Sequence, residues 1–167
     1  MPELLIMRHA KSDWSTGLDD YHRPLSKRGH RNAQRMADWL EETDRQPDAI
    51  LTSAANRAET TAAYVGEHFG SAPSFSSVPD LYLASASRWL DHLQGEDAHR
   101  LLICGHNPGL DDLVEYLGGD SADADLFTVD GKLMTTAAIA VFSVDDWATI
   151  GSATSTLVEL VRPKELA

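Results

Sequence analysis

LLIMRHA, at residues 4–10, is the stretch that decides how this chain folds. Four consecutive apolar residues bounded by polar ones predict a strand that is buried on both faces. In an open α/β sheet, ligands bind beyond the carboxyl ends of the strands, so we expect Arg8 and His9 at the edge of a site. An arginine beside a histidine is also common on ordinary surfaces. The prediction of a site therefore depends on what other strand ends bring to this edge.

Length and charge limit the classes of protein to consider. The chain has 167 residues, of which 43% are hydrophobic, and a formal net charge of −12. A chain of this length buries about 70% of its unfolded surface, which predicts one domain over residues 1–167. The acidic charge argues against nucleic acid or an anionic membrane as a partner, because both attract basic surfaces. No apolar run approaches the roughly 18 residues of a membrane span, and no secretory signal is visible.

The single cysteine, Cys104, lies inside an apolar run. We therefore expect a small buried side chain, suited to a reducing cytoplasm, and not a disulfide. The many aspartates do not fall at the spacing of calcium or zinc ligands, so we expect no metal and no cofactor. The chain is expected to act as a cytoplasmic monomer.

Apolar runs alternate with segments of helical periodicity, which predicts an α/β fold with a mostly parallel sheet. Strands are expected at residues 4–7, 49–51, 75–78, 101–104, 137–142 and 157–161, and helices at about 26–42, 57–69, 87–93 and 108–117. Ser26 is the expected cap of the first helix, Ser53 or Asn56 of the second, and Asn107 of the fourth. The polar segment at residues 13–24 is either functional or simply mobile.

Three strand ends supply the groups from which a site can be built: Arg8 with His9, Arg57, and His106. In a parallel sheet these ends lie along one edge. Arg57 falls in the first turn of a helix, where the helix dipole disfavours a cation and an anion clamp is a plausible reason for its presence. Guanidinium groups match phosphate oxygens, and a histidine without a metal can attack phosphorus. We expect a phosphoryl pocket, to which Asn107 also contributes.

The motifs RHAKS at residues 8–12, SAANRAET at residues 53–60 and GHNP at residues 105–108 resemble the histidine phosphatase superfamily, also called phosphoglycerate mutase-like. Within it, the chain looks most like the small SixA-type phosphohistidine phosphatases, a resemblance that RPLSKRG at residues 23–29 supports. The resemblance implies a three-layer α/β/α sandwich. It also implies that His9 becomes phosphorylated, while Arg8, Arg57 and His106 hold the phosphoryl oxygens.

His9 must attack as a neutral imidazole, and the neighbouring guanidinium charges are expected to lower its pKa. Larger members of the superfamily place a glutamate after the third strand as a general acid. Here that loop reads PDLYLA at residues 79–84, and Asp80 does not align with the acid. An enzyme without a strong proton donor favours leaving groups that depart easily, such as the imidazole of phosphohistidine. The lack of a helical insertion predicts an open site that admits a protein side chain.

The main hypothesis is therefore a metal-independent phosphatase that acts through His9 on phosphohistidine in a protein. One alternative is a small-molecule phosphomonoesterase with Asp80 as the proton donor. Another is a non-catalytic module that binds phosphate or a phosphoprotein. The presence of both His9 and His106 argues against that module, because binding alone needs only the cations.

Overall fold

The structure, a computed structural model, describes residues 1–70 and 73–166. Within these residues the strands form one sheet in the order β3-β2-β4-β1-β5-β6. Their bounds are β1 Glu3–Arg8, β2 Ala49–Ser53, β3 Ser74–Val78, β4 Arg100–Gly105, β5 Ile139–Val144 and β6 Ser155–Val161. The pairs β1–β4, β2–β4 and β2–β3 are parallel, whereas β5 is antiparallel to both β1 and β6. The predicted mostly parallel sheet is confirmed.

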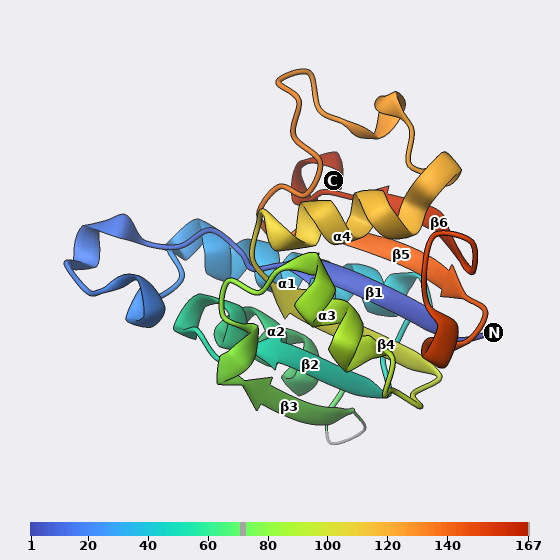
Figure 1. Ribbon diagram of the computed structural model, residues 1–167. Coiled ribbons are helices and arrows are strands. Elements are labelled where there is room, and N and C mark those ends of the chain that lie inside the picture. Colours follow the sequence, from blue (N-terminus) through green and yellow to red (C-terminus); the bar gives the residue numbers. More distant parts are fainter. Residues whose placement is uncertain (71–72, 167) are drawn as a thin grey trace.

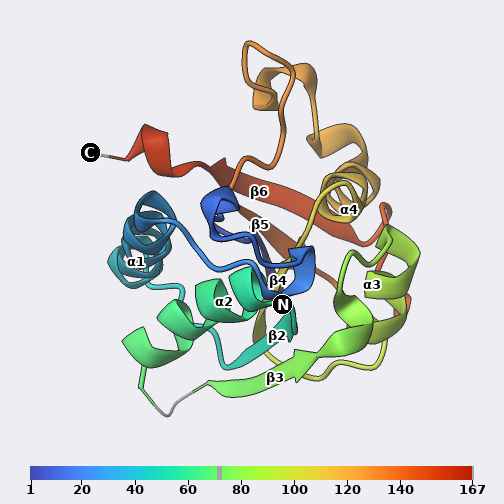
Figure 2. The same cartoon turned by 90° about the vertical axis from the view of Figure 1, so that its left-hand side faces the viewer.

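Helices cover both faces of the sheet (Figures 1 and 2). Their bounds are α1 Lys27–Glu42, α2 Asn56–His68, α3 Ala86–Leu93 and α4 Gly109–Gly118. One hydrophobic core joins α1 and α2 to the sheet, and a second joins α3 and α4 to its other face. The three-layer arrangement is therefore confirmed. Within the described residues, no helix is both long and apolar enough to cross a membrane.

The opening strand shows why the sheet is the centre of both cores. Leu5 and Met7 pack in the core beneath α1 and α2, while Leu4 and Ile6 pack in the core beneath α3 and α4. All four side chains are fully buried. This alternation follows from the period of two residues in a strand. It explains why a continuous apolar run, and not an alternating one, marks β1.

Two of the three expected helix caps are wrong. Ser26 caps α1 as predicted, since its Oγ accepts the N–H of Gly29 at 3.1 Å. The cap position of α2 is Ala55, and no side chain caps this helix. Asn56 is already helical, and its Oδ1 accepts the hydroxyl of Thr60 at 3.0 Å. The side chain of a helical residue projects away from the free amides of its own first turn, so Asn56 cannot cap them.

The start of α4 and the start of β5 also lie later than predicted. Pro108 occupies the cap position of α4, although Asn107 Oδ1 still accepts the N–H of Asp111 at 3.1 Å. β5 begins at Ile139 because Ala137 adopts a φ of +64°. The N–H of Ala137 donates to the carbonyl oxygens of both Arg8 and His9, at 3.1 Å each, where β1 ends, and the regular pairing with β1 begins at Ile139.

Gly109 allows a close approach that positions α4. A Cβ atom at this residue would lie 1.9 Å from the carbonyl oxygen of Ala84. No real side chain tolerates that distance, so only glycine allows the first residue of α4 to pack against the chain that leads into α3. His106 lies between the end of β4 and the start of α4, so this contact also helps to fix the position of His106.

We expect Gly109→Ala to lower the free energy of unfolding by at least about 1–3 kcal/mol, because the methyl group must displace backbone. Urea denaturation measures the loss. Gly95→Ala is the matched control, since the nearest atom to a Cβ there is the His92 carbonyl oxygen at 3.8 Å. Equal stability of the two variants would contradict the contact.

Candidate active site

The carboxyl ends of β1, β2 and β4 meet at one edge of the sheet, as predicted (Figure 1). The N–H of His9 donates to the carbonyl oxygen of Gly105 at 3.1 Å, which sets the end of β1 beside the end of β4. A cavity of about 240 Å³ lies at this edge. Its lining includes five of the predicted site residues: Arg8, His9, Arg57, His106 and Asn107.

His9 is buried, with 7% of its surface exposed, and its ring is held in one tautomer. Nδ1 lies 2.8 Å from the carbonyl oxygen of Ala10. Because a carbonyl only accepts hydrogen bonds, Nδ1 carries the hydrogen and Nε2 keeps its lone pair. Nε of Arg57 lies 3.4 Å from Nε2 and donates toward it. The ring therefore presents a nucleophilic nitrogen beside a guanidinium group.

Burial lowers the pKa of His9 to about 3. Charge interactions with His106, Arg8 and Arg57 contribute to this lowering of the pKa, while the hydrogen bond to Ala10 acts in the opposite direction. The sequence predicted the direction of the shift and assigned it to the guanidinium charges. Loss of hydration is the larger cause, because it removes the water that stabilises an imidazolium. At neutral pH the imidazole is uncharged.

Asp20 holds two guanidinium groups of the site in place, those of Arg57 and Arg23. Its Oδ2 accepts from Arg57 at 2.9 Å and also from the hydroxyl of Tyr82, and its Oδ1 accepts from Arg23 at 2.7 Å. The hydrogen bonds from Tyr82 and Arg57 lower the pKa of Asp20 to about 2, so it is a carboxylate at neutral pH. Sequence reasoning missed Asp20 and Tyr82. The available signal was the polar segment at residues 13–24, whose function was left open.

His106 is oriented by Ser53, the last residue of β2. Its Nε2 lies 2.8 Å from Ser53 Oγ, which also accepts the N–H of Ala55 at 3.2 Å. The Ser53 oxygen keeps a second lone pair as well as its own hydrogen, so the hydroxyl group can either donate to Nε2 or accept from it. Burial, assisted by the charge of Arg57, lowers the pKa of His106 to about 4. Nδ1 is buried and finds no partner among the described residues.

Arg8 and Asn107 share one acceptor. Both donate to the carbonyl oxygen of Met134, at 3.1 and 2.9 Å, and Asp111 accepts the N–H of the same residue. Nε of Arg8 is buried without a partner in the described part of the chain. A buried donor without a partner costs about 1–3 kcal/mol. The unpaired donor on Arg8 is therefore suited to an oxygen of an anion, and Nδ1 of His106 is suited to another when it carries the ring hydrogen.

Asp80 is not brought to the cavity. It lies in the short helix η3, Pro79–Leu81, and its carboxylate pairs with Arg88. Leu81 in the same turn is fully buried, while 62% of the Asp80 side chain is exposed. Leu81 thus faces the core and anchors this turn, whereas Asp80 faces solvent.

The metal-ligating side chain types do not gather at this edge. Among residues 1–70 and 73–166, no three His, Cys, Asp or Glu side chains lie close enough to share a metal ion. Cys104 is fully buried in β4, and burial raises the pKa of its thiol to about 12. The polar groups that line the cavity include guanidinium groups, imidazoles and hydroxyls, a set that suits phosphate oxygens.

Comparisons with known proteins show which family this chain resembles. The family model of the histidine phosphatase superfamily (branch 1) matches residues 4–100. An uncharacterized protein of Mycobacterium tuberculosis is 33% identical over 165 residues, which are 95% of this chain and 100% of that protein. Phosphohistidine phosphatase SixA of Escherichia coli is 28% identical over 148 residues, which are 86% of each chain.

Solved structures resemble the fold over nearly its whole length. The protein histidine phosphatase SixA complexed with tungstate matches with a TM-score of 0.81 and 25% identity, over 99% of each chain. A structure from Agrobacterium tumefaciens matches with a TM-score of 0.82 and 24% identity, over 98% of this chain and 99% of that one. The predicted phosphoglycerate mutase-like fold is confirmed.

Buried neutral His9 makes the stability of the protein depend on pH. Between pH 7 and pH 5, a histidine of the unfolded chain, with a pKa of about 6.5, takes up a proton, whereas folded His9 does not. The free energy of unfolding therefore falls as the pH falls. We expect the wild type to lose about 2 kcal/mol more than His9→Gln over this range.

Urea denaturation at the two pH values measures this difference. His99→Gln, at an exposed position, controls for the substitution itself. The same pH dependence in the wild type and in His9→Gln would show that the buried ring is not neutral.

Proposed function

The chain belongs to the histidine phosphatase superfamily, and on this premise we propose that it dephosphorylates phosphohistidine in a protein through a phosphohistidine intermediate on His9. Membership makes the chain a phosphatase that works through a histidine. The observation that carries the choice of His9 is its ring geometry. Nδ1 is held by the Ala10 carbonyl oxygen, and the neutral Nε2 lies beside Arg57 at the cavity.

The first step transfers the phosphoryl group to the enzyme. The lone pair of His9 Nε2 attacks phosphorus while the bond from phosphorus to the substrate imidazole breaks. A substrate ring that carries a proton on its other nitrogen leaves as neutral imidazole, so the enzyme supplies no proton. This chemistry suits a site in which Asp20 is ionised and Asp80 pairs with Arg88.

The second step releases phosphate. Phosphorylated His9 keeps its hydrogen on Nδ1 and becomes an imidazolium, which is a good leaving group. Water attacks phosphorus, the bond to Nε2 breaks, and the protons of the water pass to phosphate and solvent. His9 returns to the neutral tautomer that the Ala10 carbonyl oxygen holds. No proton has to be stored on the enzyme between the two steps.

Arg8, Arg57 and His106 are assigned to the phosphoryl oxygens in both steps. Within the described residues, Nε of Arg8 is a buried donor without a partner, and Nδ1 of His106 is a second one in the tautomer that we assign to the reaction. Positioned donors of this kind stabilise developing charge by a few kcal/mol each. Asp20 does not touch the reacting atoms in this scheme. It positions Arg57 and Arg23 by accepting from both.

Exposed apolar side chains beside the cavity support a protein substrate. Trp14 and Leu83 line the cavity, with 72% and 56% of their surfaces exposed. Leu18, in the same loop as Trp14, is also 56% exposed. The Trp14 ring lies 3.5 Å from the guanidinium carbon of Arg23, which limits its motion. Clustered exposed apolar groups are typical of protein contact sites, whereas water-soluble sugar phosphates do not need them.

His9→Ala is expected to lower phosphate release from a phosphohistidine peptide by at least about 10³-fold, because the nucleophile is lost. Wild-type protein quenched during turnover of labelled substrate should carry the label on His9. A circular dichroism spectrum checks that the variant remains folded. Undiminished turnover, or no trapped label with normal turnover, would contradict the proposed intermediate.

Asp20→Asn should lower kcat/KM about tenfold for a phosphohistidine peptide and for a sugar phosphate alike, because it disturbs Arg57 in both reactions. Asp80→Asn should change neither by more than about twofold, since Asp80 lies outside the cavity. The comparison separates positioning from acid catalysis. A loss confined to the sugar phosphate would mark the substituted residue as a proton donor and favour the small-molecule alternative.

A further inference from the structure

The phosphoryl cavity continues into two further hollows. The adjoining hollow, of about 330 Å³, shares Arg8, Lys11 and Thr136 with it. The outer hollow, of about 470 Å³, shares Arg28 and Lys164 with the adjoining one. We call these two hollows together the basic groove. Because it shares lining residues with the cavity, a ligand in the groove can belong to the same molecule as the phosphoryl group at His9.

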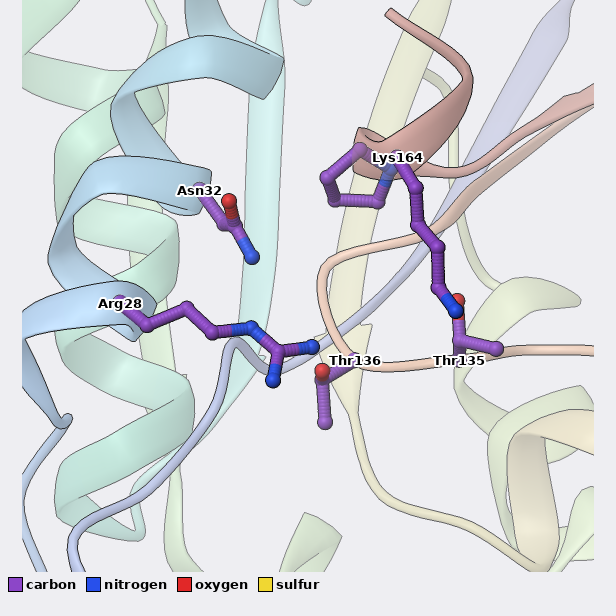
Figure 3. A pocket seen from close by; sticks show the side chains of 6 residues that line it. Arg28, Asn32, Thr135, Thr136 and Lys164 are labelled. Carbon is purple, nitrogen blue, oxygen red and sulfur yellow. The ribbon is translucent and has the colours of Figure 1, made fainter.

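The outer hollow is lined by hydrogen-bond donors from two sides (Figure 3). Arg28 and Asn32 reach into it from α1, and Lys164 faces them from the short helix η7, Pro163–Glu165. Thr136 lies between these two walls, and Thr135 lies on the side of Lys164. None of the residues that line this hollow is acidic. Such a set of groups binds carboxylate or phosphate oxygens.

Three cations of the groove have no acidic partner within the described residues. Lys11, Arg28 and Lys164 form no ion pair there. The one acid that lines the groove, Asp130, lies 3.5 Å from the ammonium group of Lys132. The chain has 26 acidic residues and 14 lysines and arginines. Unpaired cations gathered in one groove are therefore not what the overall composition would place there.

The position of Arg28 adds to this argument. It is the second residue of α1, and the first turn of that helix contains no acidic side chain. The partial positive charge of a helix amino terminus disfavours a cation by several tenths of a kcal/mol. An anion held by Arg28 would offset this unfavourable interaction between the cation and the helix dipole.

We propose that the basic groove binds acidic side chains that neighbour the phosphohistidine in the substrate protein. This inference rests on the proposed function and names the substrate class more closely. Sites for small organic molecules are lined mainly by apolar and aromatic groups. The groove has no aromatic residue in its lining, and Pro163 is its one apolar residue. Carboxylates on a peptide need only the charges and donors that the groove provides.

The net charge of −12 strengthens the orienting effect of the groove. An acidic segment is repelled by most of a negatively charged surface and attracted where the cations gather. Charge complementarity of this kind selects orientation and partner more than it adds affinity. The groove would thus orient an acidic substrate with its phosphohistidine toward His9.

The test compares two phosphohistidine peptides that differ only in the residues beside the phosphohistidine, glutamates in one and glutamines in the other. We expect wild-type kcat/KM to be about 5–10-fold higher for the acidic peptide, as two or three exposed ion pairs provide. The ratio should fall toward one in 0.5 M salt, because exposed charges are screened. It should also fall toward one in the double variant Arg28→Gln/Lys164→Gln.

The matched control is Lys27→Gln/Arg31→Gln, which removes the same charge from exposed positions of α1 that do not line the groove. This variant should keep the wild-type ratio. If both peptides are hydrolysed equally fast by the wild type, the groove proposal is overturned and the proposed function stands. If neither peptide is hydrolysed, the proposed function fails and the groove proposal fails with it.

A third arm uses a sugar bisphosphate and its monophosphate. A preference for the bisphosphate that depends on Arg28 and Lys164, with no preference between the peptides, would assign the groove to small molecules and overturn the proposal.

Discussion

The hydrogen bond from the N–H of His9 to the carbonyl oxygen of Gly105, at 3.1 Å, extends the parallel pairing of β1 and β4 past the last residue of β1. It brings the imidazoles of His9 and His106 to a ring separation of 5.2 Å. β2 pairs with the other side of β4 and presents Ser53 to His106. A shift of one residue in this register would turn these side chains to opposite faces of the sheet and dismantle the site.

Burial and charge work together at this edge. Burying His9 keeps its ring neutral, which a nucleophile requires, and the guanidinium groups beside it make protonation still less favourable. Buried cations are costly unless they are paired, and Asp20 offsets this cost for Arg57 and Arg23 from a loop outside the sheet. In the part of the chain that the structure describes, Nε of Arg8 and Nδ1 of His106 are buried without a partner. The site thus holds unsatisfied polar groups that an anion can satisfy, which is the physical basis of the assigned chemistry.

The cationic edge extends well past the reacting atoms in a protein that is otherwise acidic. Lys11 and Arg28 follow β1 along the chain, whereas Lys164 lies more than 130 residues later, after β6. Their meeting in one groove depends on Gly29, at which a Cβ would lie 2.1 Å from the carbonyl oxygen of Lys11. The start of α1 can therefore lie directly against the segment that follows β1. Close packing of backbone thus brings the groove and the phosphoryl cavity together.

Local sequence patterns determined much of the architecture. Apolar runs predicted the strands because a fully buried strand has no polar face, and Ser26 marked the start of α1 because its hydroxyl group satisfies a free amide nearby. The meeting of Arg8, His9, Arg57 and His106 at one edge of the sheet was also predictable, since parallel strands place their carboxyl ends together. The boundaries of α2, α4 and β5 were less accurate. They depend on single backbone conformations and competing hydrogen bonds, such as those of Asn56.

Only the tertiary structure decided which acid serves the site. Asp80 follows β3 in the expected loop, yet Leu81 is needed in the core and turns Asp80 toward solvent. Asp20 accepts instead from Arg57 and Tyr82, which lie 37 and 62 residues away along the chain. Contacts over such separations leave no local pattern in a single sequence. The sequence by itself therefore determined the strands and the cations at their ends, whereas the three-dimensional packing decided which groups pair, which stay neutral and which remain free to bind an anion.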